Sequence, residues 1–292
     1  MAIIIKELNY IYSPGTPFER AALKNINLTI NDGEYIGLIG HTGSGKSTLI
    51  QHFNGLLKPS GGSLSVQGIE LSAGKPDLIK LRSKVGLVFQ YPEYQLFEES
   101  VAQDIAFGPK NLGLSEAEAA ARVSEAMSLV GLPPEMGEKS PFELSGGQKR
   151  RAAVAGVIAM RPEVLVLDEP IAGLDPKGRR EMLELIDGYR AKTGATIVLV
   201  SHNMDDVAQA ADRVIVMSGG EIKKDGTPHE IFKDVAGMQE LSLDVPQAAL
   251  LADLLRSRGM PLSGNLISAR ELIEELIKHK DAILARRREA GK

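Results

Sequence analysis

Short runs of β-branched and aliphatic residues recur along the chain and alternate with stretches of helical character. Near the start, residues 3–8 and the positions Ile26, Leu28 and Ile30 alternate between apolar and polar, as half-buried strands do. Further runs are compact and apolar throughout, which is typical of strands buried in a parallel sheet. These runs are residues 35–39, 85–89, 164–167, 196–200 and 214–217.

Helical stretches lie between these runs, and several begin at a recognisable cap. Ser115 and Glu118 form a capping box ahead of a helix that is expected to reach Val130, and Pro176 begins another. The alternation predicts an α/β fold in which helices wrap a parallel sheet. An antiparallel strand region at the start and an inserted helical part near residues 91–160 complete this prediction.

The end of the chain is predicted to form a small helical tail. The main domain closes around residue 235, and Pro246 then lies near the first position of a new helix. Ser268 caps a last helix that runs toward Arg288. The two predicted parts are residues 1–240, which include the helical insertion, and residues 241–292.

The composition is that of an ordinary globular protein, and it excludes several classes of protein and of binding site. Of the 292 residues, 43% are apolar and 25% are charged, and the net charge of −4 provides no overall basic field for nucleic acid or anionic lipid. The chain has no cysteine, which excludes disulfides and thiolate metal sites. No run approaches the roughly 18 apolar residues of a membrane span, and the first residues lack a signal-peptide pattern. Any membrane role is therefore expected to be exercised from outside the bilayer.

A glycine-rich loop follows the strand expected at residues 35–39. It fits G-x-x-x-x-G-K-[ST], whose glycines let backbone N–H groups converge on phosphates at the start of a helix. Lys46 is expected to reach the β- and γ-phosphates, and the Ser47 hydroxyl to hold Mg²⁺. The loop residues predicted to bind the nucleotide are Gly40, His41, Thr42, Gly43, Ser44, Gly45, Lys46, Ser47 and Thr48.

Two carboxylates follow the buried strand predicted at residues 164–167. Ligands of α/β sheets bind at the carboxyl ends of strands, so Asp168 suits the Mg²⁺ shell. Glu169 is placed to polarise the attacking water as general base. Paired acids at a strand end are often no more than solvated caps, but the phosphate loop on the same chain favours a catalytic pair.

A second phosphate-binding helix start follows Leu144. Ser145, Gly146, Gly147 and Gln148 precede the helical stretch 149–159. One γ-phosphate cannot easily touch both helix starts of one subunit, so each start is expected to serve a different nucleotide. Taken alone, the pentapeptide is equally well explained as an ordinary capped helix.

Four smaller elements are candidates for the same site. The Gln90 amide is expected to meet Mg²⁺ or the attacking water, and His202 to hydrogen-bond the γ-phosphate. Asp175, in a tight turn, is expected to cross a subunit interface, although alone it is a helix cap. Tyr12 is expected to stack on the adenine, with Tyr10 as the competing candidate.

In this order and spacing, these residues resemble the ABC ATPase family over about residues 1–235. The matching motifs are Walker A (40–48), the Q-loop glutamine Gln90, the signature (144–148), Walker B (164–169), the D-loop (172–176) and the H-loop histidine His202. The resemblance implies a P-loop NTPase core of ABC type, with ATP and Mg²⁺, in a head-to-tail dimer that ATP closes and hydrolysis reopens. Ile171 departs from the family, which usually has threonine or serine there.

A closer resemblance is carried by residues 89–98 and 104–112. The phrase Tyr-Pro-Glu-Tyr-Gln-Leu-Phe at 91–97 is similar to the second, A-prime, ATPase of energy-coupling factor transporters. This resemblance implies a heterodimer with a paralogous ATPase, a transmembrane T subunit, and interchangeable membrane S subunits that bind vitamins or metal ions. It implies a peripheral location on the cytoplasmic side of the cell membrane, and the tail suits a dimerisation element. The alternatives are another ABC transporter, such as a homodimeric cobalt or nickel type, and a non-transport ABC ATPase.

Residues 91–99 directly follow Gln90 and combine aromatic side chains with Glu93, Glu98 and Glu99. We predict that they dock the transmembrane subunit, with the carboxylates pairing to an arginine of that subunit. The alternative is that these aromatics belong to the core.

Near the end of the chain, the basic run 286–288 is the one feature that favours an alternative function, in which the tail binds nucleic acid or lipid. A solvated helix end favoured by the helix dipole is the simpler interpretation, and no nucleic-acid partner is expected.

Overall fold

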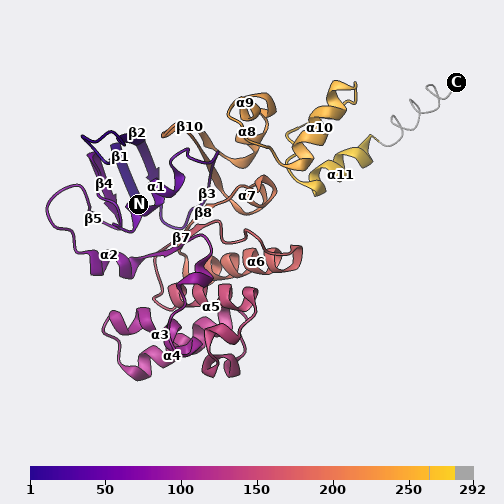
Figure 1. Cartoon of the computed structure of the whole chain (residues 1–292). Coiled ribbons are helices and arrows are strands. Elements are labelled where there is room, and N and C mark those ends of the chain that lie inside the picture. Colours follow the sequence, from indigo (N-terminus) through magenta and orange to yellow (C-terminus); the bar gives the residue numbers. More distant parts are fainter. Residues whose placement is uncertain (263, 280–292) are drawn as a thin grey trace.

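The computed structural model describes residues 1–262 and 264–279. Its larger sheet has six strands in the order β10-β9-β3-β8-β7-β6, and every neighbouring pair except β9 and β10 is parallel (Figure 1). Each apolar run predicted as a buried strand lies in this sheet. The strands are β3 (Tyr35–Gly40), β6 (Val85–Val88), β7 (Val164–Asp168), β8 (Thr196–Val200), β9 (Arg213–Ser218) and β10 (Glu221–Gly226).

The smaller sheet is antiparallel, with the strand order β2-β1-β4-β5. Its strands are β1 (Ile3–Tyr12), β2 (Arg20–Ile30), β4 (Gly61–Val66) and β5 (Ile69–Glu70). The helix α1 (Lys46–Phe53) buries Leu49, Ile50 and Phe53 in a core shared with residues of both sheets. The sheets therefore hold α1 and the loop before it in a fixed place.

The predicted helical insertion lies between β6 and β7, and we call residues 91–160 the helical subdomain. It contains η1 (Pro92–Gln95), α3 (Val101–Asn111), α4 (Glu116–Leu129), η2 (Pro134–Glu138), η3 (Pro141–Glu143) and α5 (Gly146–Ile158). The capping box of Ser115 and Glu118 begins α4 as predicted. Ala152 and Ala155 of α5 share a core with Leu165 of β7, which anchors α5 to the large sheet.

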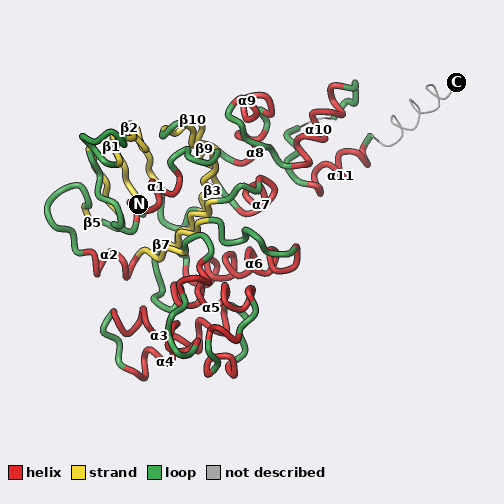
Figure 2. The backbone as a smooth tube through the Cα atoms, viewed as in Figure 1, coloured by secondary structure: helices red, strands yellow, loops and turns green. Residues whose placement is uncertain are grey.

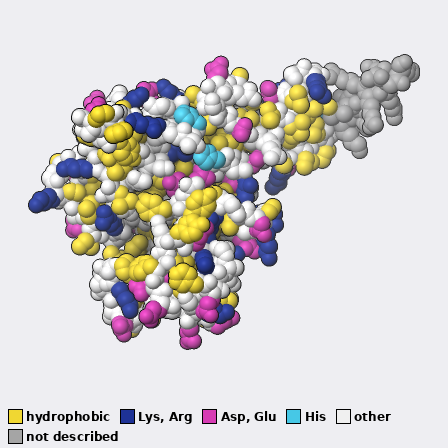
Figure 3. Space-filling view, in the orientation of Figure 1, with side chains coloured by type: hydrophobic (Ala, Val, Ile, Leu, Met, Phe, Trp, Pro, Cys, Tyr) yellow, Lys and Arg dark blue, Asp and Glu magenta, His cyan; other side chains and the backbone are white. Residues whose placement is uncertain are grey.

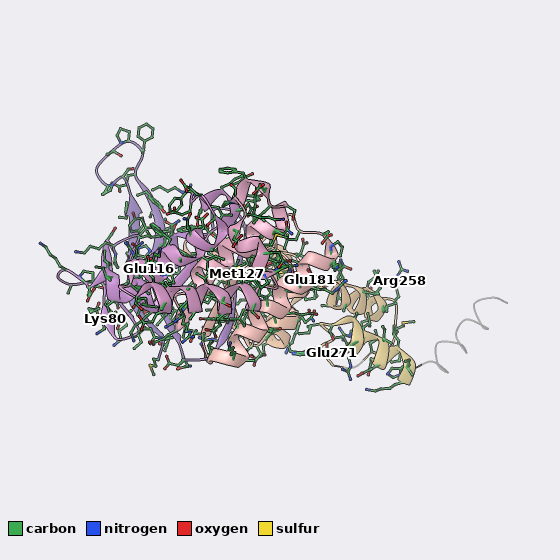
Figure 4. The ribbon with its side chains drawn as sticks, turned by 90° about the horizontal axis from the view of Figure 1, so that it is seen from below. Lys80, Glu116, Met127, Glu181, Arg258 and Glu271 are labelled. Atoms are coloured by element: carbon green, nitrogen blue, oxygen red, sulfur yellow. The ribbon has the colours of Figure 1, made fainter. Side chains whose placement is uncertain are left out.

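The remaining helices flank the large sheet or follow it (Figure 2). They are α2 (Leu78–Lys84), α6 (Pro176–Thr193), α7 (Met204–Ala210), α8 (Pro228–Phe232), α9 (Val235–Glu240), α10 (Gln247–Ser257) and α11 (Ala269–Lys278). Pro246 is the N-cap of α10, and Ser268 caps α11 as predicted. Seen from below, Glu116 of α4 and Glu271 of α11 lie far apart, so the last two helices stand away from the helical subdomain (Figure 4).

The predicted fold class is confirmed: an α/β core with an antiparallel sheet, an inserted helical subdomain and a C-terminal helical tail. The basic run 286–288 and the end of the helix expected to reach Arg288 lie outside the described residues. In the part of the chain that the structure describes, no helix is both long and apolar enough to cross a membrane.

Candidate functional site

The glycine-rich loop connects β3 to α1 and leaves the first turn of α1 open. Gly45 is the N-cap, with φ of 107°, and no side chain caps this helix start. A Cβ atom on Gly45 would lie 2.8 Å from the Ala22 carbonyl oxygen, so a larger residue is excluded by both strain and space. Uncapped N–H groups at a helix start form a site for an anion such as phosphate.

Lys46 is buried directly behind this loop. Its ammonium group donates to the carbonyl oxygens of Gly40 at 2.6 Å and His41 at 3.1 Å. Burial lowers the pKa of Lys46, although the negative charges of Glu169 and Asp168 act to raise it. The side chain is thus held against the loop itself, within reach of an anion bound there.

Asp168 is the last residue of β7 and Glu169 directly follows it, and both carboxylates are buried. Burial raises the pKa of Glu169 to about 7, and the Asp168 charge adds to the rise. Burial also raises the pKa of Asp168, although a hydrogen bond to the Ser47 side chain and the Lys46 charge oppose it. The glycine-rich loop and the acidic strand end therefore meet through Ser47 and Asp168.

The polar atoms at this meeting point fit a bound Mg²⁺ and phosphate. The Ser47 hydroxyl and the Asp168 carboxylate are hard oxygen ligands of the kind that Mg²⁺ prefers. Ser44 Oγ and Glu169 Oε1 are buried and make no hydrogen bond, as polar atoms that await a bound ligand do. The described residues form no cluster of three or more His, Asp or Glu, so a cation here needs further oxygens from phosphate or water.

Gln90 and His202 follow the two strands, β6 and β8, that flank β7 in the large sheet. Val88 of β6 pairs with Leu167, and Val200 of β8 pairs with Asp168, so both side chains extend from the edge that carries the acids. His202 Nε2 lies 3.2 Å from Glu169 Oε1, close enough for an ion pair but without hydrogen-bond alignment. Burial lowers the pKa of His202, and the Lys46 charge adds to this, whereas the Asp168 charge opposes it.

Tyr12 lines a hollow of about 160 Å³ next to the glycine-rich loop. Its hydroxyl is 3.2 Å from Thr48 Oγ1, and 37% of the residue is exposed. Tyr10 instead packs edge-on against the buried His52, with ring centroids 4.8 Å apart. Of the two candidates for adenine stacking, the geometry favours Tyr12.

Arg20 also lines this hollow, and sequence reasoning missed it. Its Nη2 would lie 3.3 Å from a Cβ atom placed on Gly43, so the guanidinium reaches the loop from β2. Nothing in the sequence marks this arginine, because its approach depends on how β2 packs beside α1.

The second helix start does not line this hollow. Ser145 is the N-cap of α5 and forms a complete capping box with Gln148. Cβ atoms on Gly146 and Gly147 would meet nothing within 4 Å, so the described chain leaves open space around them. Asp175 is likewise exposed and caps α6 by accepting from the Gly178 N–H at 2.7 Å. Within one subunit, both features are ordinary helix caps.

The aromatic side chains of residues 91–99 are exposed to solvent. Tyr91, Tyr94 and Phe97 are 45%, 86% and 62% exposed, so the alternative of core residues fails for these three. Phe97 also lines a groove of about 510 Å³ between the sheet and the helical subdomain. Hydrophobic side chains gather on this face, at the level of β7 and α5 (Figure 3).

One detail of the neighbourhood differs from the prediction, and a second is explained by packing. Glu93 does not belong to the free acidic rim, because Arg150 binds its carboxylate at 2.8 Å. Ile171, the departure from the family pattern, is buried in the core of α5 and β7. An aliphatic side chain there is explained by packing.

Comparisons with known proteins agree with this arrangement. The sequence matches the family described as ABC transporter over residues 23–172. It is 53% identical over 279 residues to the energy-coupling factor transporter ATP-binding protein EcfA2 of Caldanaerobacter subterraneus, covering 96% of this chain and 98% of the relative. It is 55% identical over 273 residues to the protein of the same name from Symbiobacterium thermophilum, covering 94% of each.

Solved structures of ATP-binding cassettes share the fold. The structure of cbiO1 from Clostridium perfringens, described as part of the ABC transporter complex cbiONQ, aligns with a TM-score of 0.73 and 40% identity over 87% of this chain and 98% of that one. A dimeric post-hydrolysis state of the cassette MJ0796 bound to ADP and Pi aligns with a TM-score of 0.70 and 28% identity, over 77% of this chain and 98% of that one.

Proposed function

Because the chain belongs to the ABC transporter family, and within it to the ATP-binding subunits of energy-coupling factor transporters, we propose how its residues divide the work of hydrolysis. As such a subunit it binds and hydrolyses ATP and thereby energises import. One observation carries the proposal. Ser47 and Asp168 meet beside Lys46 at one site, whereas the helix that begins after Ser145 is open to the outside.

The first site acts on the ATP held by this chain. Lys46 binds the β- and γ-phosphates together with the N–H groups of the loop, and the Tyr12 ring stacks on the adenine. Ser47, Asp168 and Gln90 hold Mg²⁺, which neutralises phosphate charge when bound. This assignment is supported by the contact of Ser47 with Asp168 and by the shared sheet edge of Gln90 and Asp168.

Glu169 and His202 complete the chemistry at the γ-phosphate. Glu169 accepts a proton from the attacking water, a task for which a raised pKa near 7 is well matched at neutral pH. His202, whose pKa is lowered by burial, donates a hydrogen bond to the γ-phosphate. The close approach of His202 to Glu169 supports a shared task.

The second site acts on the ATP of a partner subunit. Ser145, Gly146, Gly147 and Gln148 cap the γ-phosphate of the partner's nucleotide when the dimer closes, and Asp175 crosses the same interface. The open space around Gly146 and Gly147 supports this assignment, since a second subunit has room to approach. The isolated subunit therefore hydrolyses ATP poorly.

The membrane partners dock on residues 91–99 and the groove beside them. The T subunit inserts an arginine-bearing helix, which meets Tyr94 and Phe97 and pairs with Glu98 and Glu99. Charge reversal of Glu98 and Glu99 should leave the subunit folded and active in ATP binding but reduce co-purification of the T subunit. Undiminished assembly of that variant would remove this surface from the proposal.

The C-terminal part, from residue 241 onward, serves as a dimerisation element with the paralogous ATPase. Its helices carry exposed aliphatic side chains, which a partner would bury. These residues are Leu250, Leu251, Leu254, Ile273 and Ile277. The site of action is the cytoplasmic face of the cell membrane, where the S subunits select vitamins or metal ions.

Purification of the tagged chain from its native membrane tests the whole assignment. We expect a second ATPase, a T subunit and at least one S subunit to come with it, and the complex to hydrolyse ATP. A homodimer without membrane subunits would contradict the proposal, and so would an assembled complex that binds ATP without turnover.

A further inference from the structure

Arg150 is placed in an unusual position for an arginine. It lies in α5, five residues after Ser145, and only 4% of it is exposed. Among residues 1–262 and 264–279 it is the only arginine that is buried. Removing a guanidinium from water is costly, so its partners are informative about its task.

The guanidinium group joins three separate segments of the chain. Its Nε and Nη2 bind the two carboxylate oxygens of Glu93 at 3.1 and 2.8 Å. Its Nη1 donates to the carbonyl oxygens of Pro170, at 3.4 Å, and Ala172. The group also lies 5.9 Å from the centre of the Tyr91 ring. Burial alone would raise the pKa of Glu93, but the hydrogen bonds and charge of Arg150 outweigh it and lower that pKa.

These three segments each have a place in the function proposed above. Glu93 belongs to η1, in the segment proposed to dock the T subunit, three residues after Gln90. Pro170 directly follows the general base Glu169, and Ala172 begins the D-loop. Arg150 itself lies about 7–8 Å along the axis of α5 from the Ser145 cap.

We propose that Arg150 is a positioning residue that fixes the docking segment, the signature helix and the D-loop relative to one another. A shift of the docking segment is then passed through Glu93 and Arg150 to the helix that caps the partner's ATP and to the turn after Glu169. The planar fork of five donors suits this task, because it can bind a carboxylate on one side and carbonyl groups on another. Lysine keeps the charge but cannot hold both sides at once.

The simpler alternative is an ion pair that only stabilises the fold. The two cases differ in kinetics, since Arg150 makes none of its contacts with the loop around Lys46. A positioning role predicts a lower kcat with an unchanged KM for ATP. A purely structural role predicts less folded complex, with the remaining complex hydrolysing ATP at the normal kcat and KM.

The test uses the full complex, and this inference rests on the proposed function. We expect Arg150→Lys to lower kcat at least about tenfold with KM for ATP within about twofold, and Glu93→Gln to lower kcat about three- to tenfold. The double variant should be no slower than Arg150→Lys alone, because both changes break one linkage. Arg161→Lys is the matched control, since Arg161 pairs with Glu125 on the exposed side of the helical subdomain and should keep the wild-type kcat.

Three outcomes overturn the inference. These are a kcat of Arg150→Lys within twofold of wild type, an effect confined to KM, and failure of both single variants to assemble while the control assembles. If only Arg150→Lys fails to assemble, Glu93→Gln decides, because it leaves the arginine on its two carbonyl groups. A wild-type complex that does not hydrolyse ATP would instead contradict the proposed function.

Discussion

The helices α1 and α5 both begin in glycine-rich loops, yet their first turns are built differently. At α1 the N-cap is Gly45 in a left-handed conformation, and no side chain occupies the open N–H groups. At α5 the N-cap is Ser145, whose hydroxyl accepts from the Gln148 N–H while the Gln148 side chain accepts from the Ser145 N–H at 2.9 Å. The first start is open for a ligand, whereas the second satisfies its own donors.

The difference shows how one chain can carry two phosphate sites that serve different nucleotides. The α1 start has the charge and acids it needs beside it, namely Lys46, Asp168 and Glu169. At the α5 start, Cβ atoms on Gly146 and Gly147 would meet nothing within 4 Å, and a phosphate there must replace the contact between Ser145 and Gln148. The phosphate site at the start of α1 is therefore best explained as a site within this chain. The phosphate site at the start of α5 is best explained as one that a second subunit completes.

The largest expected effect tests whether the chemistry belongs to the α1 site. Glu169→Gln should keep ATP binding but slow hydrolysis by about 10²–10⁴-fold, because the amide no longer accepts the proton of the attacking water. Steady-state hydrolysis and ATP binding in the purified complex measure the two quantities. Glu163→Gln, at the opposite end of β7 in an exposed pair with Lys84, serves as the control and should stay near wild type. Normal turnover of Glu169→Gln would show that another group is the base.

The next effect tests whether the α5 site belongs to a partner. Ser145→Arg should reduce hydrolysis at the partner's nucleotide by about 10²–10³-fold, because the large side chain blocks closure over its γ-phosphate. ATP binding at this chain's own loop should change less than about twofold. Crosslinking of photoreactive labelled ATP to each chain of the mixed complex separates the two sites.

A matched variant controls for loss of a helix cap. Ser140→Arg removes the same type of capping box, at η3, without changing the start of α5. It should leave the partner's site intact. Should Ser145→Arg instead abolish ATP binding at its own Lys46 and spare the partner's site, the head-to-tail arrangement proposed here is wrong.

Much of the fold follows from local pattern, and the limits of that pattern are physical. The runs that form β3, β7 and β8 are apolar on both faces and bounded by polar residues, so their position is visible in sequence. In contrast, β4 is rich in glycine and serine, and its strand form depends on pairing with β1. The helix α3 lies in the predicted helical insertion, but its own start was not identified, although Ser100 and Gln103 form a capping box there.

The residues of the candidate site also fall into two groups: those that a local motif identifies and those that only tertiary packing brings together. Contiguous motifs identify Lys46, Ser145 and Glu169, because each lies in a loop or strand end whose form is local. The pairing of Glu93 with Arg150, 57 positions apart, depends on how η1 packs on α5 and leaves no trace in either segment. For this reason the sequence suggested a free carboxylate at Glu93, where the structure has a partly buried ion pair with Arg150.

A smaller effect, on ATP binding, is expected when the α1 site loses the positive charge of the Lys46 side chain. Lys46→Ala should weaken ATP binding about 10–100-fold, the usual worth of hydrogen bonds to a charged group. Calorimetric titration of the complex with ATP measures this change. Lys58→Ala, an exposed lysine after α1, provides the control and should bind as wild type. Unchanged binding together with unchanged turnover in Lys46→Ala would refute the assignment of this loop.

The smallest effect compares the exposed aromatic side chains that lie near the two helix starts. Tyr12 contacts Thr48 of α1, and Phe142 lies before α5 with the Lys149 ammonium 5.7 Å from its ring centre. Tyr12→Ala should weaken this chain's own ATP binding about two- to tenfold through loss of stacking, whereas Tyr12→Phe keeps the ring and should bind nearly as wild type. Phe142→Ala should leave this binding unchanged, because that ring belongs to the start that faces a partner. Titration of each variant with a fluorescent ATP analogue measures these differences. Equal losses in Tyr12→Ala and Phe142→Ala would mean that both helix starts contact one nucleotide, which would contradict the division between them.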